Sequence, residues 1–260
     1  EHRPEAVYHL AGAADVAESW QQPLSTWEAN ATATVRLLDA CRLAGVRRVL
    51  VSGSADVYGT VTPDALPLTE ATPPAPRSPY AASKLAAEAA TRQAWLGWGL
   101  ETISVRAFNH LGPGQRPVFV APALATAVAR NEQTGGTEVP VGDLSARRDF
   151  TDVRDVVRAY RHLIEDGEPG ETYCVCSGVD VAVRDLADVL LAQASHAMTL
   201  VPDPRRQRAI DLPVLRGSNA KIQAATGWQP EIPLATSLHD VLTDARARVA
   251  GDPEPLGVPE

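Results

Sequence analysis

The stretch Arg48-Val49-Leu50-Val51-Ser52 is a short, almost continuous apolar run. Such a run is typical of a strand that is buried on both faces of a parallel sheet. A similar run precedes it at Ala6-Val7-Tyr8-His9-Leu10-Ala11-Gly12, and another follows at Thr102-Ile103-Ser104-Val105-Arg106. Helical patterns separate the three runs, at 24–44 and at 80–96. This alternation of strands and helices predicts an α/β fold whose parallel strands are joined by right-handed crossovers.

The composition is ordinary and acidic. The chain has 260 residues, of which 45% are hydrophobic and 22% charged, and its formal net charge is −8. These values predict a soluble globular protein, built as one large domain or two interleaved lobes. The acidic balance argues against nucleic acid as a partner, no apolar run approaches the length of a membrane span, and the first residues do not resemble a signal peptide. The cysteines, Cys41, Cys174 and Cys176, have no metal-binding spacing, so we predict no metal site and reduced thiols in a cytoplasmic protein.

The second helix opens with Ser78-Pro79-Tyr80-Ala81-Ala82-Ser83-Lys84, in which a serine can cap the helix and a proline suits its first turn. Tyr80 and Lys84 are four residues apart, so they share one helix face. A phenol has a pKa of about 10, and a neighbouring ammonium favours the phenolate. We therefore expect Lys84 to lower the pKa of Tyr80, so that the pair can exchange a proton with a carbonyl oxygen while hydride moves to or from its carbon. The alternative is a tyrosine packed under the helix, with a surface lysine nearby.

Other polar residues follow the predicted strands. Ligands of open parallel sheets bind outside the carboxyl ends of the strands. The stretches expected there are Ala11-Gly12, Ser54-Ala55-Asp56, Tyr80 with Lys84, and Phe108-Asn109-His110. Together Ser54, Tyr80 and Lys84 supply the groups needed to polarise and protonate a carbonyl. The alternative for Ser54 is a turn or cap serine, and the alternative for Asp56 is a loop residue that caps an amide.

Several blocks of the sequence are similar to one known family. These blocks are Tyr8-His9-Leu10-Ala11-Gly12, Asn30, Ser54 followed by Val57-Tyr58-Gly59, and Tyr80-Ala81-Ala82-Ser83-Lys84. They resemble the fourth strand, a helix asparagine and the catalytic residues of the extended short-chain dehydrogenase/reductase (NAD-dependent epimerase/dehydratase) family. The resemblance implies a doubly wound parallel, Rossmann-type sheet with a smaller α/β substrate-binding lobe. It implies a partial dinucleotide-binding domain at 1–112 and 151–178, and a nucleotide-sugar-binding lobe at 113–150 and 179–260.

Within this family, the chain is most similar to the reductases of GDP-4-dehydro-6-deoxy-D-mannose. The blocks that carry this similarity are Arg106-Ala107-Phe108-Asn109-His110-Leu111-Gly112-Pro113-Gly114-Gln115, Gly142-Asp143-Leu144, the run from Arg148-Asp149-Phe150 to Val156, Tyr173-Cys174-Val175-Cys176-Ser177-Gly178 and Thr226-Gly227-Trp228-Gln229-Pro230. The resemblance implies an oxidoreductase that reduces the C4 ketone of a nucleotide-diphosphate 4-keto-6-deoxy sugar to give GDP-D-rhamnose. Two alternatives stay open: a GDP-mannose 4,6-dehydratase or another nucleotide-sugar epimerase/dehydratase, and a non-catalytic fragment or binding protein.

The resemblance also implies roles for individual residues. The catalytic residues would be Ser54, Tyr80 and Lys84, with Asp56 as the candidate base of a dehydratase. The cofactor, NAD or NADP, would contact Leu10, Ala11, Gly12, Tyr80, Lys84 and Phe108. The nucleotide-diphosphate part of the substrate would contact Asn109, Arg148, Arg206, Arg208 and Asp211. Guanidinium groups suit diphosphate oxygens, and the alternative for the arginines is a solvated basic loop.

The start of the chain departs from the family pattern. The turn G-x-x-G-x-x-G, whose backbone amides hold a pyrophosphate, does not occur in this sequence. The sequence begins where the family's fourth strand begins, so we expect a sheet without its first strands, which is a difference of about sixty residues or two strand–helix units. The residue that separates NAD from NADP lies in that portion of the family. The resemblance further implies a homodimer, in which the helices at 25–44 and 80–96 form a four-helix bundle with their symmetry mates.

Overall fold

A computed structural model describes residues 4–206 and 213–251 of the chain. The chain divides into two compact units. The first unit comprises Glu1–His110, Asp149–Asp180 and Val214–Glu231, and the second comprises Leu111–Arg148, Val181–Pro213 and Ile232–Glu260. We expected residues 214–231 in the second lobe, whereas they belong to the first unit. The reason is the burial of Trp228, which is 2% exposed, in the hydrophobic core of the first unit.

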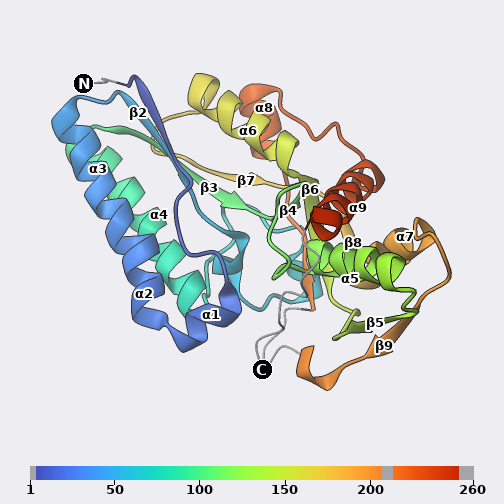
Figure 1. Cartoon of the computed structure of the whole chain (residues 1–260). Helices are drawn as coiled ribbons and strands as arrows, with labels where there is room; N and C mark the ends of the chain where they lie inside the picture. Colours follow the sequence, from blue (N-terminus) through green and yellow to red (C-terminus); the bar gives the residue numbers. More distant parts are fainter. Residues whose placement is uncertain (1–3, 207–212, 252–260) are drawn as a thin grey trace. The chain divides into compact units, whose positions relative to one another are not determined.

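The first unit is built on a parallel sheet with the strand order β1-β2-β3-β7. Its strands are β1 (Ala6–His9), β2 (Arg48–Ser52), β3 (Glu101–Ala107) and β7 (Thr172–Val175). One face is covered by the helices α3 (Ala33–Ala44) and α4 (Pro79–Trp98), and the short helices α1 (Val16–Gln21) and α2 (Pro23–Trp27) pack against α4 (Figure 1). The other face is covered by α6 (Val153–Asp166) and α8 (Ala220–Thr226). The prediction of a doubly wound, parallel α/β fold is confirmed.

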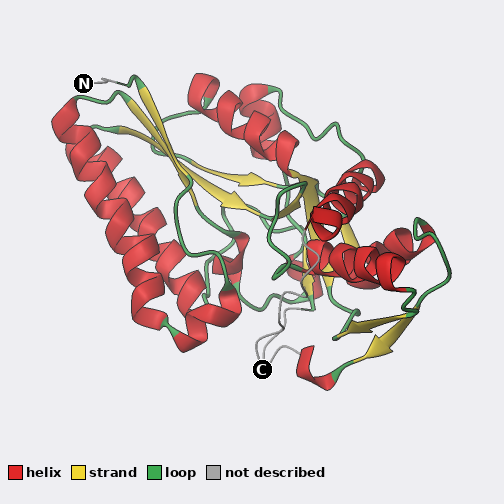
Figure 2. Ribbon diagram, viewed as in Figure 1, coloured by secondary structure: helices red, strands yellow, loops and turns green. Residues whose placement is uncertain are grey.

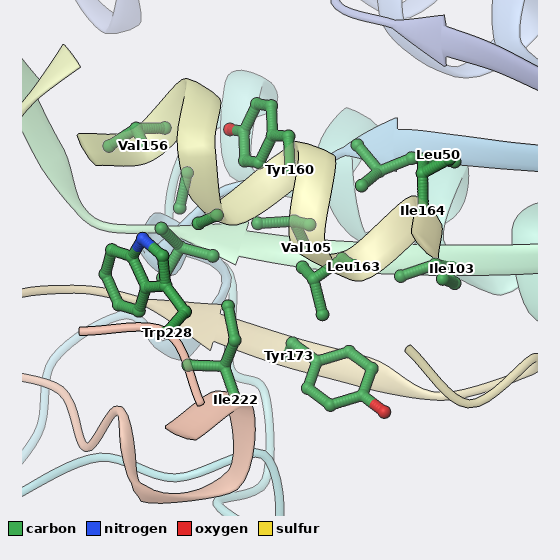
Figure 3. Close-up of a cluster of buried hydrophobic side chains, with 13 residues drawn as sticks. Leu50, Ile103, Val105, Val156, Tyr160, Leu163, Ile164, Tyr173, Ile222 and Trp228 are labelled. Atoms are coloured by element: carbon green, nitrogen blue, oxygen red, sulfur yellow. The ribbon is translucent and has the colours of Figure 1, made fainter. Parts of the chain in front are cut away.

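Strand β2 is buried on both faces, which explains its continuous apolar sequence. Val49 and Val51 pack with residues of α3 and α4 in one hydrophobic cluster. Leu50, between them in sequence, points to the opposite face and packs in a second cluster with Leu163 of α6 and Trp228 (Figure 3). Because successive side chains of a strand point to opposite faces, only an unbroken apolar run can fill both clusters. Burying each such side chain contributes about 1.5–3 kcal/mol.

The predicted helix at 24–44 is interrupted. Between α2 and α3 the backbone forms a π-helical turn, η1 (Glu28–Thr32), and α3 then ends at Gly45, whose φ of 69° is left-handed. π-Helical turns of this kind occur frequently at functional sites. Asn30, the asparagine singled out by the family resemblance, lies in this turn.

The second unit contains a group of packed helices and a two-stranded parallel sheet (Figure 2). The helices α5 (Val120–Thr134), α7 (Val183–Ala192) and α9 (Leu234–Gly251) contact one another. The sheet pairs β5 (Glu138–Val141) with β9 (Thr199–Pro202). The remaining strands lie near the places where the chain passes from one unit to the other; they are β4 (Asn109–Leu111), β6 (Arg147–Asp152), β8 (Asp180–Ala182) and β10 (Val214–Leu215). Short 3-10 turns are η2 (Ala55–Tyr58), η3 (Pro63–Ala65) and η4 (Pro204–Arg206).

Two observations concern the wider classification of the chain. Among the described residues, no helix is both long enough and apolar enough to cross a membrane. In the same part of the chain, no group of three or more His, Cys, Asp and Glu side chains could hold a metal ion. Cys41, Cys174 and Cys176 are free and buried.

Candidate active site

Ser54 lies directly beyond the carboxyl end of β2. The backbone N–H of Gly53 donates to the carbonyl of Val105 at 2.7 Å, and a Cβ at position 53 would collide with that same oxygen. Glycine therefore allows β2 to end close against β3, with Ser54 as the next residue. The Ser54 hydroxyl oxygen accepts a hydrogen bond from the N–H of Asp56 at 3.2 Å and caps η2. The cap interpretation is thus correct, but the same hydroxyl also hydrogen-bonds Tyr80.

Tyr80 and Lys84 lie in the first turns of α4. Ser78 caps the helix by accepting a hydrogen bond from the N–H of Ala81 at 3.1 Å, and Pro79 occupies the first turn, as the sequence predicts. The Lys84 ammonium lies 6.0 Å from the centroid of the Tyr80 ring and donates to the carbonyl of Ser52 at 2.9 Å. The carboxyl end of β2 and the start of α4 therefore bring Ser54, Tyr80 and Lys84 together.

The pKa of Tyr80 differs from the expectation. Burial raises it above its ordinary value, the nearby charge of Asp56 raises it further, and the hydrogen bond from Ser54 lowers it. The phenol is 8% exposed, so loss of hydration outweighs its hydrogen bond and the phenol stays protonated at neutral pH. Burial also lowers the pKa of Lys84 to about 8. The expectation that Lys84 would lower the pKa of Tyr80 is therefore wrong for the protein without ligands.

The carboxyl end of β1 borders the same place. The backbone from Leu10 to Gly12 is exposed, and the Leu10 side chain is 56% exposed. A Cβ at Gly12 would lie 2.6 Å from Asn30 Oδ1 and 3.5 Å from Lys84 Nζ. Asn30 Oδ1 is buried and has no hydrogen-bond partner among the described residues. An open backbone segment, an ammonium and a buried acceptor around a glycine fit a ligand that carries hydroxyl or amide donors, such as the ribose and carboxamide of a nicotinamide nucleotide.

Two further residues expected in the first unit have contrasting environments. Phe108 is 3% exposed, and its ring lies 6.3 Å from the ring of Tyr58. Gly217 makes its close approach possible, because a Cβ there would collide with the Phe108 ring. Asn109, the first residue of β4, is exposed. The packing of Phe108 gives it a structural role, whatever it also contacts in a complex.

The expected arginines are in the second unit. Arg148 in β6 is 9% exposed and donates through Nη1 to the carbonyl of Arg147 at 2.8 Å. The Arg206 side chain is 44% exposed, and its Nε lies 3.6 Å from Asp203 Oδ2. Arg208 and Asp211 lie outside the described residues.

A chain of buried polar contacts next to this site was not predicted. Asn30 Nδ2 donates to Ser83 Oγ at 2.9 Å, and Ser83 Oγ donates to the carbonyl of Tyr80 at 2.7 Å. On the other side of η1, Thr34 Oγ1 donates to the carbonyl of Asn30 at 2.6 Å and lies 3.1 Å from His9 Nε2. The one sequence feature that could have indicated these contacts is the presence of small polar residues on otherwise buried faces. The contacts themselves join residues that are far apart in the sequence.

Comparison with known proteins gives consistent results. Residues 1–241 match the model of the family described as GDP-mannose 4,6 dehydratase. The chain is 41% identical over 248 residues to the GDP-6-deoxy-D-mannose reductase of Pseudomonas aeruginosa, covering 95% of this chain and 82% of that protein. It is 33% identical to the UDP-glucose 4-epimerase of Mycolicibacterium smegmatis, covering 92% of this chain and 75% of that protein.

Solved structures are similar as well. The structure of RMD from Pseudomonas aeruginosa complexed with NADPH matches with a TM-score of 0.91 and 40% identity, over 95% of this chain and 83% of that one. The Thermus thermophilus UDP-glucose 4-epimerase in complex with NAD matches with a TM-score of 0.83 and 29% identity, over 94% of this chain and 78% of that one.

Proposed function

Because the chain belongs to the GDP-mannose 4,6-dehydratase family of extended short-chain dehydrogenases/reductases, we propose that it is a nicotinamide-dependent GDP-sugar reductase. The proposed reaction reduces the C4 ketone of GDP-4-dehydro-6-deoxy-D-mannose to GDP-D-rhamnose. The observation that carries this proposal is the meeting of Ser54, a protonated Tyr80 and Lys84 at the strand ends, together with 41% identity to a GDP-6-deoxy-D-mannose reductase.

In this proposal each residue acts on the oxygen of the C4 ketone. When bound, the nicotinamide supplies the hydride that adds to C4. Tyr80 gives its phenolic proton to the oxygen, which becomes a hydroxyl, and Ser54 donates a hydrogen bond to the same oxygen. Lys84, next to the carboxyl end of β1, holds the cofactor together with Leu10, Ala11 and Gly12. It also helps Tyr80 to regain its phenolic proton after the transfer. The cofactor is NAD or NADP, and Phe108 is proposed to border it.

The protonated state of Tyr80 suits a reductase, and the residues that follow Ser54 argue against a dehydratase. A reductase needs a proton donor from the start, which a buried phenol with a raised pKa provides. An epimerase or 4,6-dehydratase begins by oxidising C4, which needs Tyr80 as a base. A dehydratase also needs a group that removes the C5 proton. Ala55 cannot do this, and Asp56, the remaining candidate, is one methylene shorter than glutamate.

The two units have different roles in this proposal. We propose that the first unit binds the cofactor and that the second contributes to nucleotide-sugar binding. Asn109, Arg148, Arg206, Arg208 and Asp211 are the proposed contacts of the nucleotide diphosphate. The guanidinium groups can each donate two hydrogen bonds to phosphate oxygens, which is the geometry that a diphosphate favours.

A homodimer in the cytoplasm completes the proposal. Large apolar side chains are exposed along the helices of one face of the first unit; they are Trp20, Leu24, Trp27, Val35, Leu43, Leu96 and Trp98. A second copy covering α3 and α4 would bury much of this surface. We expect light scattering to give a particle of twice 27.7 kDa, and Leu43→Glu to return a monomer. Val179→Glu, at a residue that is 64% exposed away from these helices, is the matched control.

The reaction is tested with two substrates. The protein is incubated with GDP-4-dehydro-6-deoxy-D-mannose and NADH or NADPH, and the loss of absorbance of the reduced nicotinamide is followed. In parallel it is incubated with GDP-mannose and oxidised cofactor, and loss of water is followed by mass spectrometry. We expect turnover only in the first reaction. A 4-keto-6-deoxy product from GDP-mannose would instead establish a dehydratase with Asp56 as its base.

A further inference from the structure

The side of α4 that carries Tyr80 and Lys84 continues to Glu88. The three residues are spaced by four positions, so they lie along one face of the helix. Lys84 donates to the carbonyl of Ser52, the last residue of β2, at 2.9 Å. Glu88 accepts from Nη2 and Nε of Arg106 in β3, at 2.7 and 2.9 Å. This face of the helix is therefore attached to two neighbouring strands near their carboxyl ends.

The pair formed by Glu88 and Arg106 is buried and closely fitted. Burial lowers the pKa of Arg106, but its contacts with Glu88 and Tyr58 outweigh burial and raise that pKa above its ordinary value. The guanidinium is therefore charged, and two of its N–H groups point at the two carboxylate oxygens. Its remaining nitrogen, Nη1, donates to the carbonyl of Glu70 at 3.3 Å. A planar group with partners on all three nitrogens has a fixed orientation.

Tyr58 packs against this guanidinium. The centroid of its ring lies 4.9 Å from Arg106 Cζ, and its hydroxyl donates to the carbonyl of Thr69 at 2.8 Å. The side chain is 1% exposed, and Tyr58 is the last residue of the turn η2. Because a cation attracts the face of an aromatic ring, the place of the ring depends on the place of the guanidinium.

The segment that carries Ser54 is held at both ends by neighbouring residues of β3. At its start, the N–H of Gly53 donates to the carbonyl of Val105 at 2.7 Å. At its end, the Tyr58 ring faces the side chain of the next residue of that strand. Between these points Ser54 caps η2, which contacts α4, and its hydroxyl hydrogen-bonds Tyr80. Loosening the end of η2 would therefore change the place of the serine hydroxyl.

We propose that Glu88 is a positioning residue that keeps the Ser54 hydroxyl against the phenol of Tyr80. It does so by fixing the guanidinium of Arg106, which in turn fixes the ring at the end of η2. The importance of this effect for catalysis rests on the proposed function, in which Ser54 and Tyr80 act on the same ketone oxygen. An ion pair that only stabilised the fold would leave the two hydroxyl groups together in every variant that folds.

The first measurement reads the phenol directly, in the protein without cofactor or substrate. The chain contains five tyrosines, so labelling tyrosine with ¹³C at the ζ-carbon gives five NMR signals, and Tyr80→Phe assigns that of Tyr80. Ser54→Ala gives the position of this signal without the hydrogen bond. Glu88→Gln keeps one acceptor for Arg106 and turns the other into a donor. We expect Glu88→Gln to move the Tyr80 signal most of the way to its position in Ser54→Ala, and to move it no further when the two changes are combined.

The second measurement is steady-state kinetics with the proposed substrate. Glu88→Gln should lower kcat by about 10–100-fold and change KM for the nucleotide sugar by less than about twofold, since a displaced hydroxyl acts on the reacting oxygen and not on the nucleotide. In the Ser54→Ala background, the same change should not lower kcat further. A wild-type protein without turnover would refute the reductase assignment, whereas the NMR measurement would still decide this proposal.

Glu101→Gln is the control for a general loss of stability. Glu101 accepts from Arg48 Nε at 3.1 Å, at the amino ends of β3 and β2, and the side chains are 35% and 10% exposed. This change should leave the Tyr80 signal and kcat as they are. If Glu88→Gln does not fold, Arg106→Lys keeps the charge without the planar fork and should move the signal less, in the same direction. An unmoved signal in a folded variant, an equal movement in the Ser54→Ala background, or the same movement in Glu101→Gln overturns the proposal.

Discussion

Replacing Glu88 by leucine should strongly destabilise the first unit. Arg106 donates from Nη2 and Nε to the two carboxylate oxygens of Glu88, at 2.7 and 2.9 Å. The side chains of this pair are only 6% and 12% exposed, so Glu88→Leu leaves a buried guanidinium without its counter-ion. Breaking a buried pair on one side costs about 3–5 kcal/mol. The Arg106 guanidinium also lies 4.9 Å from the Tyr58 ring, a contact that does not replace a carboxylate.

Urea unfolding followed by circular dichroism measures this cost. With a slope of about 2–3 kcal/mol/M, the midpoint should fall by about 1–2.5 M. Adding Arg106→Met should restore most of the loss, because two apolar side chains replace the ion pair. Asp188→Ala removes the exposed pair with Arg184, whose side chains are 54% and 59% exposed, and should cost less than about 0.5 kcal/mol. A cost below about 1 kcal/mol for Glu88→Leu, or a double variant no more stable than the single one, would refute this reasoning.

Three further predictions concern the candidate site. Tyr80→Phe removes the proton donor but keeps the ring, so steady-state kinetics should show turnover lowered by about 10²–10⁴-fold, while calorimetry shows unchanged nucleotide-sugar binding; residual turnover above about a tenth contradicts the assignment. The pKa of Lys84, about 8 in the folded protein, lies below the value of about 10.4 for an unfolded lysine, so deprotonation favours the folded state as pH rises between these values. The unfolding free energy of wild type should therefore rise relative to that of Lys84→Met from pH 8 to pH 10. A constant difference would show that Lys84 is not desolvated. Arg148→Ala should weaken binding of the GDP-sugar by about 1.5–3 kcal/mol in calorimetry, and unchanged affinity would mean that Arg148 is structural.

The sequence predicts the sheet well because local patterns determine it. The apolar run at 48–52 and the capping residues Ser78 and Pro79 each act over a few positions, and the structure agrees with them. The interruption of the first long helix at η1 was not predicted, because Asn30 is held there by Ser83, which is 53 residues away. Trp228 was assigned to the wrong unit for a similar reason. Its indole N–H donates to the carbonyl of Asp155 at 3.0 Å, a contact that no local pattern contains.

In the candidate site, too, the sequence predicts one property and misses another. The motif residues Ser54, Tyr80 and Lys84 meet as expected, because strand and helix geometry place them at one edge of the sheet. Their ionisation could not be predicted from spacing, since burial decides it. Burial raises the pKa of Tyr80 and lowers that of Lys84, in spite of their separation by a single helical turn.

The contact between Asn30 and Ser83 has a consequence for how the sequence can diverge. Position 83 needs a side chain that donates to a helix carbonyl and accepts from an amide in a fully buried space, and a small hydroxyl residue meets both needs. Alanine or valine at 83 would leave the asparagine amide short of an acceptor, so either change is tolerated better where position 30 has also lost its amide. Across a set of descendants, positions 30 and 83 should therefore vary as a pair, even though 53 residues separate them in the chain.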